Sequence, residues 1–271
     1  YSTQDVMGQL AGGAYTVMPG VPTMFHYLME GGKADPAFAM RGMRLCISAG
    51  AILPGTLTRA FEARFGIPLL DGYGITETST FVTMNAPHAT RLDGSCGLPL
   101  PGGATRIIDP NTGRDCGPGE EGELIVRGPH VMPGYHNKPE ETAKAIRDGW
   151  FHTGDLARAD ANGFLTITGR LKELIIRGGQ NIAPAEVEEA IVLHADVLDC
   201  AVVAGPHQHL GEVPVAFVVP RAGAALDVEA LLVHCRARLS AYKVPHEVRL
   251  IDAIPRTGSG KTIRYKLREL L

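Results

Sequence analysis

The sequence predicts a mixed α/β and α+β protein, and three observations support this fold class. Helix and strand patterns alternate between Val21 and Glu77, short β-rich segments follow from Gly97 to Thr168, and a second α+β pattern begins after Lys172. We therefore expect the end of a parallel α/β subdomain, a β-rich, barrel-like subdomain and a small C-terminal α+β domain. The expected domains are the C-terminal portion of a large domain at 1–168 (α/β to about residue 95, β-rich at 96–168), a hinge at 169–172, and a mobile domain at 173–271.

The first region has the pattern of a parallel α/β layer. VPTMFHYLME (21–30) is typical of a helix, and MRLCISAG (43–50) and IPLLDGYG (67–74) are typical of buried strands. Between the strands, LPGTLTRAFEARFG (53–66) has apolar residues at four-residue spacing and ends at Gly66, which we interpret as a helix C-cap. A strand–helix–strand unit of this length predicts a right-handed parallel crossover, with ligand-binding loops at the carboxyl ends of the strands.

The second region is β-rich. ATRIIDPNTGRDC (104–116), GELIVRG (122–128) and GFLTITG (163–169) are strand-like segments, and they are separated by Asn-Thr-Gly, Pro-Gly and Ala-Asn-Gly turns. This pattern predicts an antiparallel sheet or small barrel beside the parallel sheet.

The last region returns to an α+β pattern. Pro184 opens a helix whose first turns carry three glutamates, which suit the positive helix N-terminus. Asp227 is predicted to cap a second helix that buries one apolar face. The remaining expected elements are strands at DCAVVAG (199–205), VPVAFVVPR (213–221) and EVRLI (247–251), and a final helix at TIRYKLRELL (262–271).

Composition narrows the possible partners and the compartment. The chain of 271 residues is 45% hydrophobic and 20% charged with a net charge of −3, so its net field does not attract nucleic acid or an anionic membrane. No apolar run approaches the roughly 20 residues that span a bilayer. Five scattered cysteines without a CxxC pair argue against a disulfide scaffold or a thiolate metal site, and favour a reducing, cytoplasmic location. The chain opens without Met or a signal-peptide pattern, and we interpret this start as lying within a domain.

PRTGSGKT (255–262) lies between a predicted strand and a predicted helix, where a phosphate-binding loop is expected. The P-loop pattern requires glycine six residues before Lys261, but this position is Pro255, which lacks an N–H group. We therefore expect a mobile glycine-rich loop that carries one lysine into solvent. Taken alone, the motif also fits a flexible C-terminal turn.

DGYGITETS begins at the end of a predicted strand, at the edge where α/β proteins bind ligands. Tyr73 can stack on a base, Thr76 can donate to a phosphate, and the Glu77 carboxylate can hold Mg²⁺. Gly72 and Gly74 are expected to leave room for a ligand beside the backbone. The alternative interpretation is a capped loop.

GWFHTGDLA (149–157) places Asp155 in a predicted tight turn. A carboxylate in this position can accept both hydroxyl groups of a ribose. The alternative is an Asx-turn, which is common for Asp after Gly.

Taken together, these segments resemble the AMP-forming adenylating enzymes, a superfamily that includes acyl- and aryl-CoA ligases, luciferases and peptide-synthetase adenylation domains. The resemblance covers most of the chain from about residue 45 and is specific because six segments occur in collinear order. The segments are SAGAILP, DGYGITET, GYHNKPEET, GWFHTGDLA, GRLKELIIRGGQNIAPAEVE and PRTGSGKTIRYKLREL.

The resemblance implies roles in nucleotide binding. Gly50, Ala51 and Tyr73 would enclose adenine, Thr76 would contact the α-phosphate, and Glu77 would bind Mg²⁺. Asp71, Gly72 and Gly74 belong to the same nucleotide-binding segment.

The resemblance also implies roles for the last part of the chain. Asp155 would hold the ribose hydroxyl groups with help from Arg170, and Lys261 would bridge the carboxylate and the α-phosphate as charge develops. Lys172 would be the hinge about which the C-terminal domain rotates between two half-reactions. Gly178 and Gly179 would line the path of the pantetheine thiol of CoA.

The implied function is ATP-dependent activation of a carboxylic acid to acyl-AMP, followed by thioester formation with CoA. An apolar or fatty acid is expected because Phe81 and Val82 are expected to line part of the acid pocket. The spacing between DGYGITET and GWFHTGDLA and the end of the chain soon after Lys261 favour a CoA ligase over a domain that loads a carrier protein.

The family's Ser/Thr/Gly-rich loop for the β- and γ-phosphates is absent from the sequence. We therefore expect the chain to be the C-terminal half of an acyl-CoA ligase, to need the N-terminal half of the same enzyme, and to be inactive alone. A non-catalytic nucleotide-binding protein that has lost this loop is the alternative of a different class.

Overall fold

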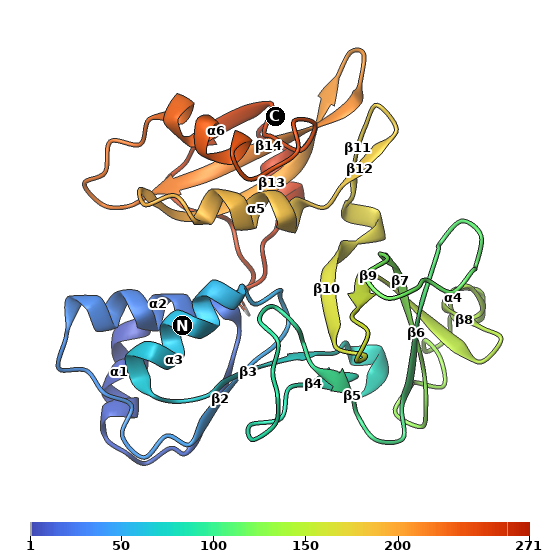
Figure 1. Cartoon of the computed structure of the whole chain (residues 1–271), viewed down its shortest axis with the longest axis horizontal. Helices are drawn as coiled ribbons and strands as arrows, with labels where there is room; N and C mark the ends of the chain where they lie inside the picture. The colour runs from blue at the N-terminus through green and yellow to red at the C-terminus, as the bar shows by residue number, and fades with distance from the viewer. Residues whose placement is uncertain (1, 259) are drawn as a thin grey trace. The chain divides into compact units, whose positions relative to one another are not determined.

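The computed structural model describes residues 2–258 and 260–271. The chain divides into two compact units, Tyr1–Ile167 and Thr168–Leu271. Figure 1 shows the elements of each unit along the chain, with the second unit in yellow to red. Ser259, in the glycine-rich segment before Lys261, lies outside the described residues.

The first unit begins with a parallel sheet. Its strands β1 (Val17–Gly20), β2 (Leu45–Ser48) and β3 (Leu69–Tyr73) are parallel neighbours, as the strand–helix–strand pattern predicts. Two short antiparallel strands, β4 (Thr83–Met84) and β5 (Leu98–Pro99), extend the sheet at the β3 edge.

Three helices, α1 (Thr3–Ala11), α2 (Pro22–Ala34) and α3 (Gly55–Phe65), share a core with this sheet. The prediction for α3 is confirmed at its end: Gly66 has φ 67°, and its N–H donates to the Glu62 carbonyl at 2.8 Å. The four-residue apolar spacing buries Phe61 completely, and its ring makes a T-shaped contact with the Phe25 ring.

The β-rich part forms a second, antiparallel sheet. Its strand order is β10–β9–β7–β6, and β8 pairs with β9. The bounds are β6 (Ala104–Ile108), β7 (Gly122–Arg127), β8 (Ile146–Arg147), β9 (Trp150–Ala159) and β10 (Leu165–Arg170). The short helix α4 (Pro139–Ala145) precedes β8. Leu124, Val126, Ala157 and Leu165 are buried in the core of this part.

The second unit is built on a long hairpin of β13 (Val197–His207) and β14 (Gly211–Pro220). Strand β15 (Glu247–Leu250) runs parallel to β14 along Val215–Val218. In the hairpin of β11 (Ile175–Arg177) and β12 (Gln180–Ile182), β11 pairs antiparallel with β14 at Gly211.

Alternate residues of the long hairpin face two separate cores. Val202 and Val218 pack with α5 (Pro184–Val192) and α6 (Val228–Arg236), whereas Val203 and Phe217 pack with Leu267 of α7 (Arg264–Arg268). This alternation is the period-2 pattern of a strand that is buried on both faces.

The helix ends of the second unit follow the sequence, with one correction. Pro184 occupies the first turn of α5, and the Asp227 side chain accepts the Glu229 N–H at 2.9 Å, as predicted. The predicted final helix at 262–271 is shorter, because α7 ends at Arg268 and the last residues form a turn.

Among the described residues, no helix is long and apolar enough to cross a membrane. All five cysteines are free thiols. Burial raises the pKa of the Cys46 and Cys96 thiols to about 12, so both remain protonated at neutral pH and behave as small apolar side chains.

Candidate functional site

The structure brings two distant motifs into direct contact at the end of β3. The Tyr73 hydroxyl donates a hydrogen bond to Asp155 Oδ2 at 2.6 Å, although the two residues are 82 positions apart. Asp155 is only 4% exposed, and Tyr73 is half-buried. A short hydrogen bond to a buried carboxylate fixes both side chains, so the two motifs form one site.

Asp155 lies within strand β9, which corrects the tight turn predicted from the sequence. The prediction fails because Gly154, at φ 69°, adopts the left-handed conformation inside the strand. The β7–β9 register shifts here, so that Glu123 pairs with Leu156 while Ile125 pairs with His152. The glycine therefore marks an irregularity that changes the direction of the following side chain, Asp155.

Buried polar groups hold this irregularity in place. Glu123, 5% exposed, accepts the Gly154 N–H at 3.1 Å, and its other oxygen lies 2.9 Å from His152 Nδ1. Thr153 Oγ1 donates to the Leu124 carbonyl at 2.7 Å and accepts the Asp155 N–H at 3.0 Å. The conformation before Asp155 is thus fixed on both sides by neutral and charge-assisted hydrogen bonds.

Glu77 lies in the 3₁₀ turn η1 (Thr76–Thr78), just beyond β3. Tyr135 donates its hydroxyl proton to Glu77 Oε1 at 3.0 Å, and the Met132 N–H donates to the Glu77 carbonyl at 2.8 Å. Burial and the Glu77 carboxylate raise the pKa of Tyr135, which keeps its hydroxyl group a donor at neutral pH. Thr76 itself is exposed at the start of the turn.

Gly74 makes room for the protein's own backbone rather than for a ligand. A Cβ atom at this position would lie 1.4 Å from the Thr80 carbonyl oxygen, and one at Gly72 would lie 2.9 Å from the Phe81 ring. The expectation that these glycines leave space for a ligand is therefore wrong, because segment 80–81 fills that space.

Backbone strain accompanies this close contact. Ser79 (φ 54°) and Thr80 (φ 98°) are consecutive non-glycine residues with positive φ. For a β-branched residue such as Thr80 this conformation is unfavourable, and such residues cluster at functional sites. The Thr80 N–H donates to the Ile75 carbonyl at 3.3 Å, which helps to close the turn.

Two further predicted residues lie at the same sheet edge. Gly50 (φ 85°) and Ala51 are exposed just after β2, and the β2–β3 register pairs Ser48 with Asp71. Because the two strands are parallel, the residues that follow β2 and those that follow β3 lie at the same end of the sheet, where the carboxyl ends of the strands meet. Burial raises the pKa of Asp71 well above its usual range, and a hydrogen bond from the Gly72 N–H acts in the opposite direction.

The other predicted residues belong to the second unit. Arg170 ends β10, and Lys172 is exposed in the 3₁₀ turn η2 (Leu171–Glu173). Gly178 (φ 55°) and Gly179 (φ 82°) form the two-residue turn of the β11–β12 hairpin, where Arg177 pairs with Gln180. Two positive φ angles in such a turn favour glycine for conformational reasons alone.

The predicted mobility of the glycine-rich loop stays a prediction, and the main chain of Lys261 is hydrogen-bonded to Thr257. The Lys261 N–H donates to Thr257 Oγ1 at 3.1 Å, and the Lys261 carbonyl accepts the Thr257 N–H at 2.8 Å. Arg256 and Thr262 form an antiparallel bridge across the base of the loop. The Lys261 side chain is exposed, as predicted.

Comparison with known proteins identifies the family. Residues 3–136 match the family described as "AMP-binding enzyme", and residues 186–261 match "AMP-binding enzyme C-terminal domain". The chain belongs to the AMP-forming adenylating enzymes.

Several curated relatives of the chain are named as acyl-CoA ligases or synthases. Feruloyl-CoA synthase of Amycolatopsis sp is 40% identical over 257 residues, which are 93% of this chain and 51% of that protein. Long-chain-fatty-acid–CoA ligase of Bacillus subtilis (strain 168) is 40% identical over 254 residues, which are 94% of this chain and 45% of that protein. Sulfoacetate–CoA ligase of Cupriavidus necator is 44% identical over 254 residues, which are 91% of this chain and 48% of that protein.

The fold comparison agrees with the family. The crystal structure of ATP-bound MatB from Rhodopseudomonas palustris matches with a TM-score of 0.91 and 36% identity, over 100% of this chain and 53% of that chain. The chain thus spans about half the length of the curated and structural relatives that it matches. The predicted fold class, with its parallel, barrel-like and α+β parts, is confirmed.

Glu123, His152 and Tyr135 have contacts at the candidate site that the sequence does not predict. The only sequence signal for Glu123 is one glutamate beside the apolar run LIV, and a lone charge at the start of a strand is usually exposed. Tyr135 lies in the quoted segment GYHNKPEET, but nothing local links it to Glu77. Only the folded chain reveals these partners.

The described residues contain no group of three or more His, Cys, Asp or Glu side chains that could hold a metal ion. Mg²⁺, however, is usually held by one or two carboxylates together with substrate phosphates and water. The half-buried Glu77 carboxylate, oriented by Tyr135, fits that kind of incomplete site.

Proposed function

We propose that the complete gene product activates a carboxylic acid with ATP, forming acyl-AMP and pyrophosphate, and then transfers the acyl group to CoA. The observation that carries the proposal is the 2.6 Å contact between Tyr73 and Asp155. It joins the segment expected to bind adenine and phosphate to the segment expected to bind ribose. The acyl-CoA ligases among the relatives support the same reaction class.

In this proposal the nucleoside binds at the carboxyl ends of the parallel strands β2 and β3. Gly50 and Ala51 after β2, together with the Tyr73 ring after β3, enclose adenine. The Asp155 carboxylate accepts hydrogen bonds from the ribose hydroxyl groups, with help from Arg170. Asp71, Gly72 and Gly74 shape the turn that presents Tyr73 to the base, because the glycines allow the tight backbone contact described above.

The phosphate groups are handled by η1 and by the second unit. Thr76 donates to the α-phosphate, and Glu77 binds the Mg²⁺ that neutralises phosphate charge. The substrate carboxylate attacks the α-phosphorus and pyrophosphate leaves. Lys261 stabilises the negative charge that develops between the carboxylate and the α-phosphate.

Thioester formation follows after a domain rotation. Lys172 is the proposed hinge, and rotation of the 173–271 domain removes Lys261 from the site. The turn of Gly178 and Gly179 then lines the path of the CoA thiol, which attacks the acyl carbonyl carbon and displaces AMP. Open space beyond Gly179 is compatible with this path.

The 271 residues contain no Ser/Thr/Gly-rich loop for the β- and γ-phosphates. We therefore propose that an N-terminal half of the same enzyme binds the β- and γ-phosphates, and that full activity requires the two halves together. We propose the cytoplasm as the location.

We propose an apolar or fatty acid as the substrate. Half-buried Phe81 packs beside Gly72 and is the candidate for the acid pocket, whereas Val82 is 2% exposed and belongs to the core. The relatives named above act on aromatic, long-chain and sulfonated acids according to their names, so the acid class needs a direct assay.

Pyrophosphate release by the complete gene product, measured with a panel of acids in the presence and absence of CoA, tests the reaction. We expect acid-dependent release with MgATP and thioester accumulation only when CoA is added. Lys261→Ala should slow acyl-AMP formation about 10²–10³-fold while it leaves thioester formation from prepared acyl-AMP near normal. Absence of acid-dependent release across the panel, or thioester formation without ATP, would reject the proposed reaction.

A further inference from the structure

We infer that Arg256 and Asp199 are positioning residues for Lys261, and that they act specifically in acyl-AMP formation. The inference rests on the proposed function of Lys261. It adds two residues to which the family resemblance assigned no role, and it follows from the contacts of the loop that carries the lysine.

Arg256 contacts the residues on both sides of Lys261, one through its carbonyl group and the other through its side chain. Its Nη1 atom donates to the Gly260 carbonyl at 3.0 Å and to Thr262 Oγ1 at 3.2 Å. Gly260 and Thr262 are the two chain neighbours of Lys261. One guanidinium group therefore fixes the residue before the lysine and the residue after it.

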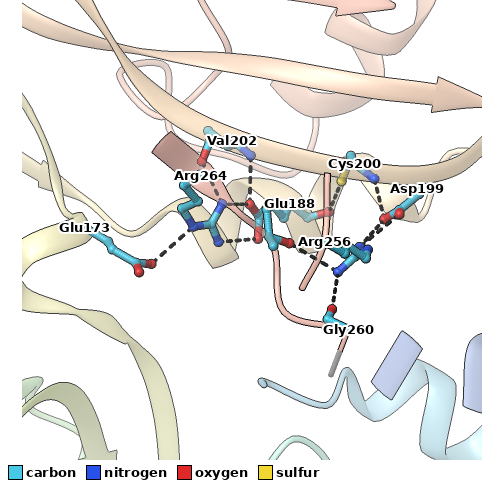
Figure 2. A network of polar contacts seen from close by, with 9 residues as sticks. Glu173, Glu188, Asp199, Cys200, Val202, Arg256, Gly260 and Arg264 are labelled. Carbon is cyan, nitrogen blue, oxygen red and sulfur yellow. Dashed lines mark hydrogen bonds and ion pairs between the residues drawn. The ribbon is translucent and has the colours of Figure 1, made fainter. Parts of the chain in front are cut away.

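Asp199 fixes the guanidinium group in turn. The Arg256 Nη2 atom lies 2.8 Å from Oδ1 and 2.9 Å from Oδ2 of Asp199, and both side chains are about one-fifth exposed. Figure 2 shows Arg256 between the Asp199 carboxylate and the Gly260 carbonyl. A charge-assisted pair of this kind orients the arginine much more strongly than an exposed pair does.

The position of Asp199 comes from an irregularity in the central hairpin. The β13–β14 register shifts between Val197 and Asp199, and the Asp199 Oδ1 atom also accepts the Cys200 N–H at 2.9 Å. A bulge redirects one side chain out of the regular alternation of a strand. Through Arg256 and Asp199, the loop of Lys261 is therefore anchored to the largely buried strand pair β13–β14 of the second unit.

A second arginine anchors the chain after the loop. Arg264, at the start of α7, contacts Glu188 of α5 with Nη1–Oε1 at 2.5 Å and Glu173 of η2 with Nε–Oε2 at 3.2 Å. It also donates to the Val202 carbonyl at 2.9 Å. Arg264 supports the helix rather than the loop itself, so the specific positioning role belongs to Arg256.

Together these contacts hold the Lys261 backbone while its side chain stays exposed. The Lys261 N–H and carbonyl are both bonded to Thr257, and Arg256 holds the flanking residues. The flexible lysine side chain loses conformational entropy when it contacts a transition state. A fixed main-chain position at Lys261 reduces the additional entropy that must be lost, and therefore favours the reaction. Only the half-reaction that uses Lys261 needs this alignment.

The test uses Asp199→Asn and Arg256→Lys in the complete gene product. Asp199→Asn keeps the shape and removes the charge, whereas Arg256→Lys keeps the charge and removes the two-sided contact. Glu186→Gln is the matched control, because it breaks another ion pair of the same unit, with Lys243 Nζ 2.6 Å from Oε1, outside the loop. Lys261→Ala is the reference for loss of the lysine itself.

We expect both variants to lower kcat for acyl-AMP formation by about 10- to 100-fold, with KM for ATP changed less than kcat, because misplacing a catalytic group affects the transition state most. Thioester formation from prepared acyl-AMP and CoA should stay near the rate of the Glu186→Gln control. Amide hydrogen exchange at 257 and 260–262 should become faster in Asp199→Asn, a change that does not depend on activity.

The outcomes separate the two proposals. If Lys261→Ala is selective for acyl-AMP formation but Asp199→Asn and Arg256→Lys match the control, the positioning role is wrong and the proposed function stands. An equal loss of both half-reactions in these two variants would mean a general effect on the fold and would also overturn the positioning role. If Lys261→Ala itself affects neither half-reaction, both proposals fail.

Discussion

At the residue scale, the pairs that define the site are non-local. Tyr73 and Asp155 meet at 2.6 Å across 82 positions, and Arg256 and Asp199 meet across 57. A local motif indicates that each of these residues can bind a ligand or form an ion pair, but it does not indicate which distant residue it contacts.

The Tyr73–Asp155 pair leads to a prediction about ATP binding. Asp155→Asn should raise KM for ATP about 10- to 100-fold, because the amide offers one acceptor oxygen to the ribose hydroxyl groups and Tyr73 where the carboxylate offers two. Tyr73→Phe keeps the aromatic face for adenine and should have a smaller effect in the same direction. Pyrophosphate exchange at varied ATP concentrations measures both changes, and Tyr265→Phe is the control because Tyr265 is exposed. An unchanged KM in Asp155→Asn would exclude a role in ribose binding.

At the element scale, the sequence correctly predicts helix ends and caps, which depend on local interactions. The α3 end at Gly66, the α5 start at Pro184 and the Asp227 cap of α6 are correct, because each depends on residues within one or two turns. The prediction of a tight turn at Asp155 is wrong, because the residue lies in a strand with an irregularity at Gly154. Glu123 from β7 holds this irregularity through the Gly154 N–H. A glycine in a sequence signals a special backbone conformation, but not whether it ends a strand or lies inside one.

Gly74 gives a test of the turn after β3. Gly74→Ala should destabilise the protein by more than about 3 kcal/mol, because a Cβ atom there would collide with the Thr80 backbone, which cannot rotate away as a side chain can. Gly66→Ala is the matched control: its φ of 67° should cost about 1–2 kcal/mol, and no atom lies within 4 Å of the new Cβ.

Denaturant unfolding of both variants measures the two free energies. Since the turn carries Thr76 and Glu77, Gly74→Ala should also reduce acyl-AMP formation in the fraction that remains folded. Equal destabilisation by the two substitutions would show that segment 80–81 can move away, and that the close contact does not define the turn.

At the scale of the whole molecule, the chain divides between Ile167 and Thr168, a few residues before Lys172. The family pattern in the sequence indicates a joint there, because the charged residues of GRLKE stand between the β-rich region and an α+β region. The 3₁₀ turn η2 at Leu171–Glu173 is a short element with no buried residue, so a change in its backbone angles would uncover no core side chain of its own. Its closeness to the division supports Lys172 as the proposed hinge.

Lys172→Pro tests this hinge. Proline fixes φ near −65° and restricts the preceding Leu171, so the variant should hold one orientation of the C-terminal domain and slow one half-reaction at least about tenfold more than the other. Lys172→Ala removes the same side chain but leaves φ free, and it should slow both half-reactions by less than about twofold, because the side chain is exposed. Acyl-AMP formation and thioester formation from prepared acyl-AMP are measured separately in the complete gene product. A Lys172→Pro variant that slows both half-reactions by one common factor would place the hinge elsewhere, whereas a selective loss in Lys172→Ala would assign the effect to the lysine side chain rather than to backbone rotation.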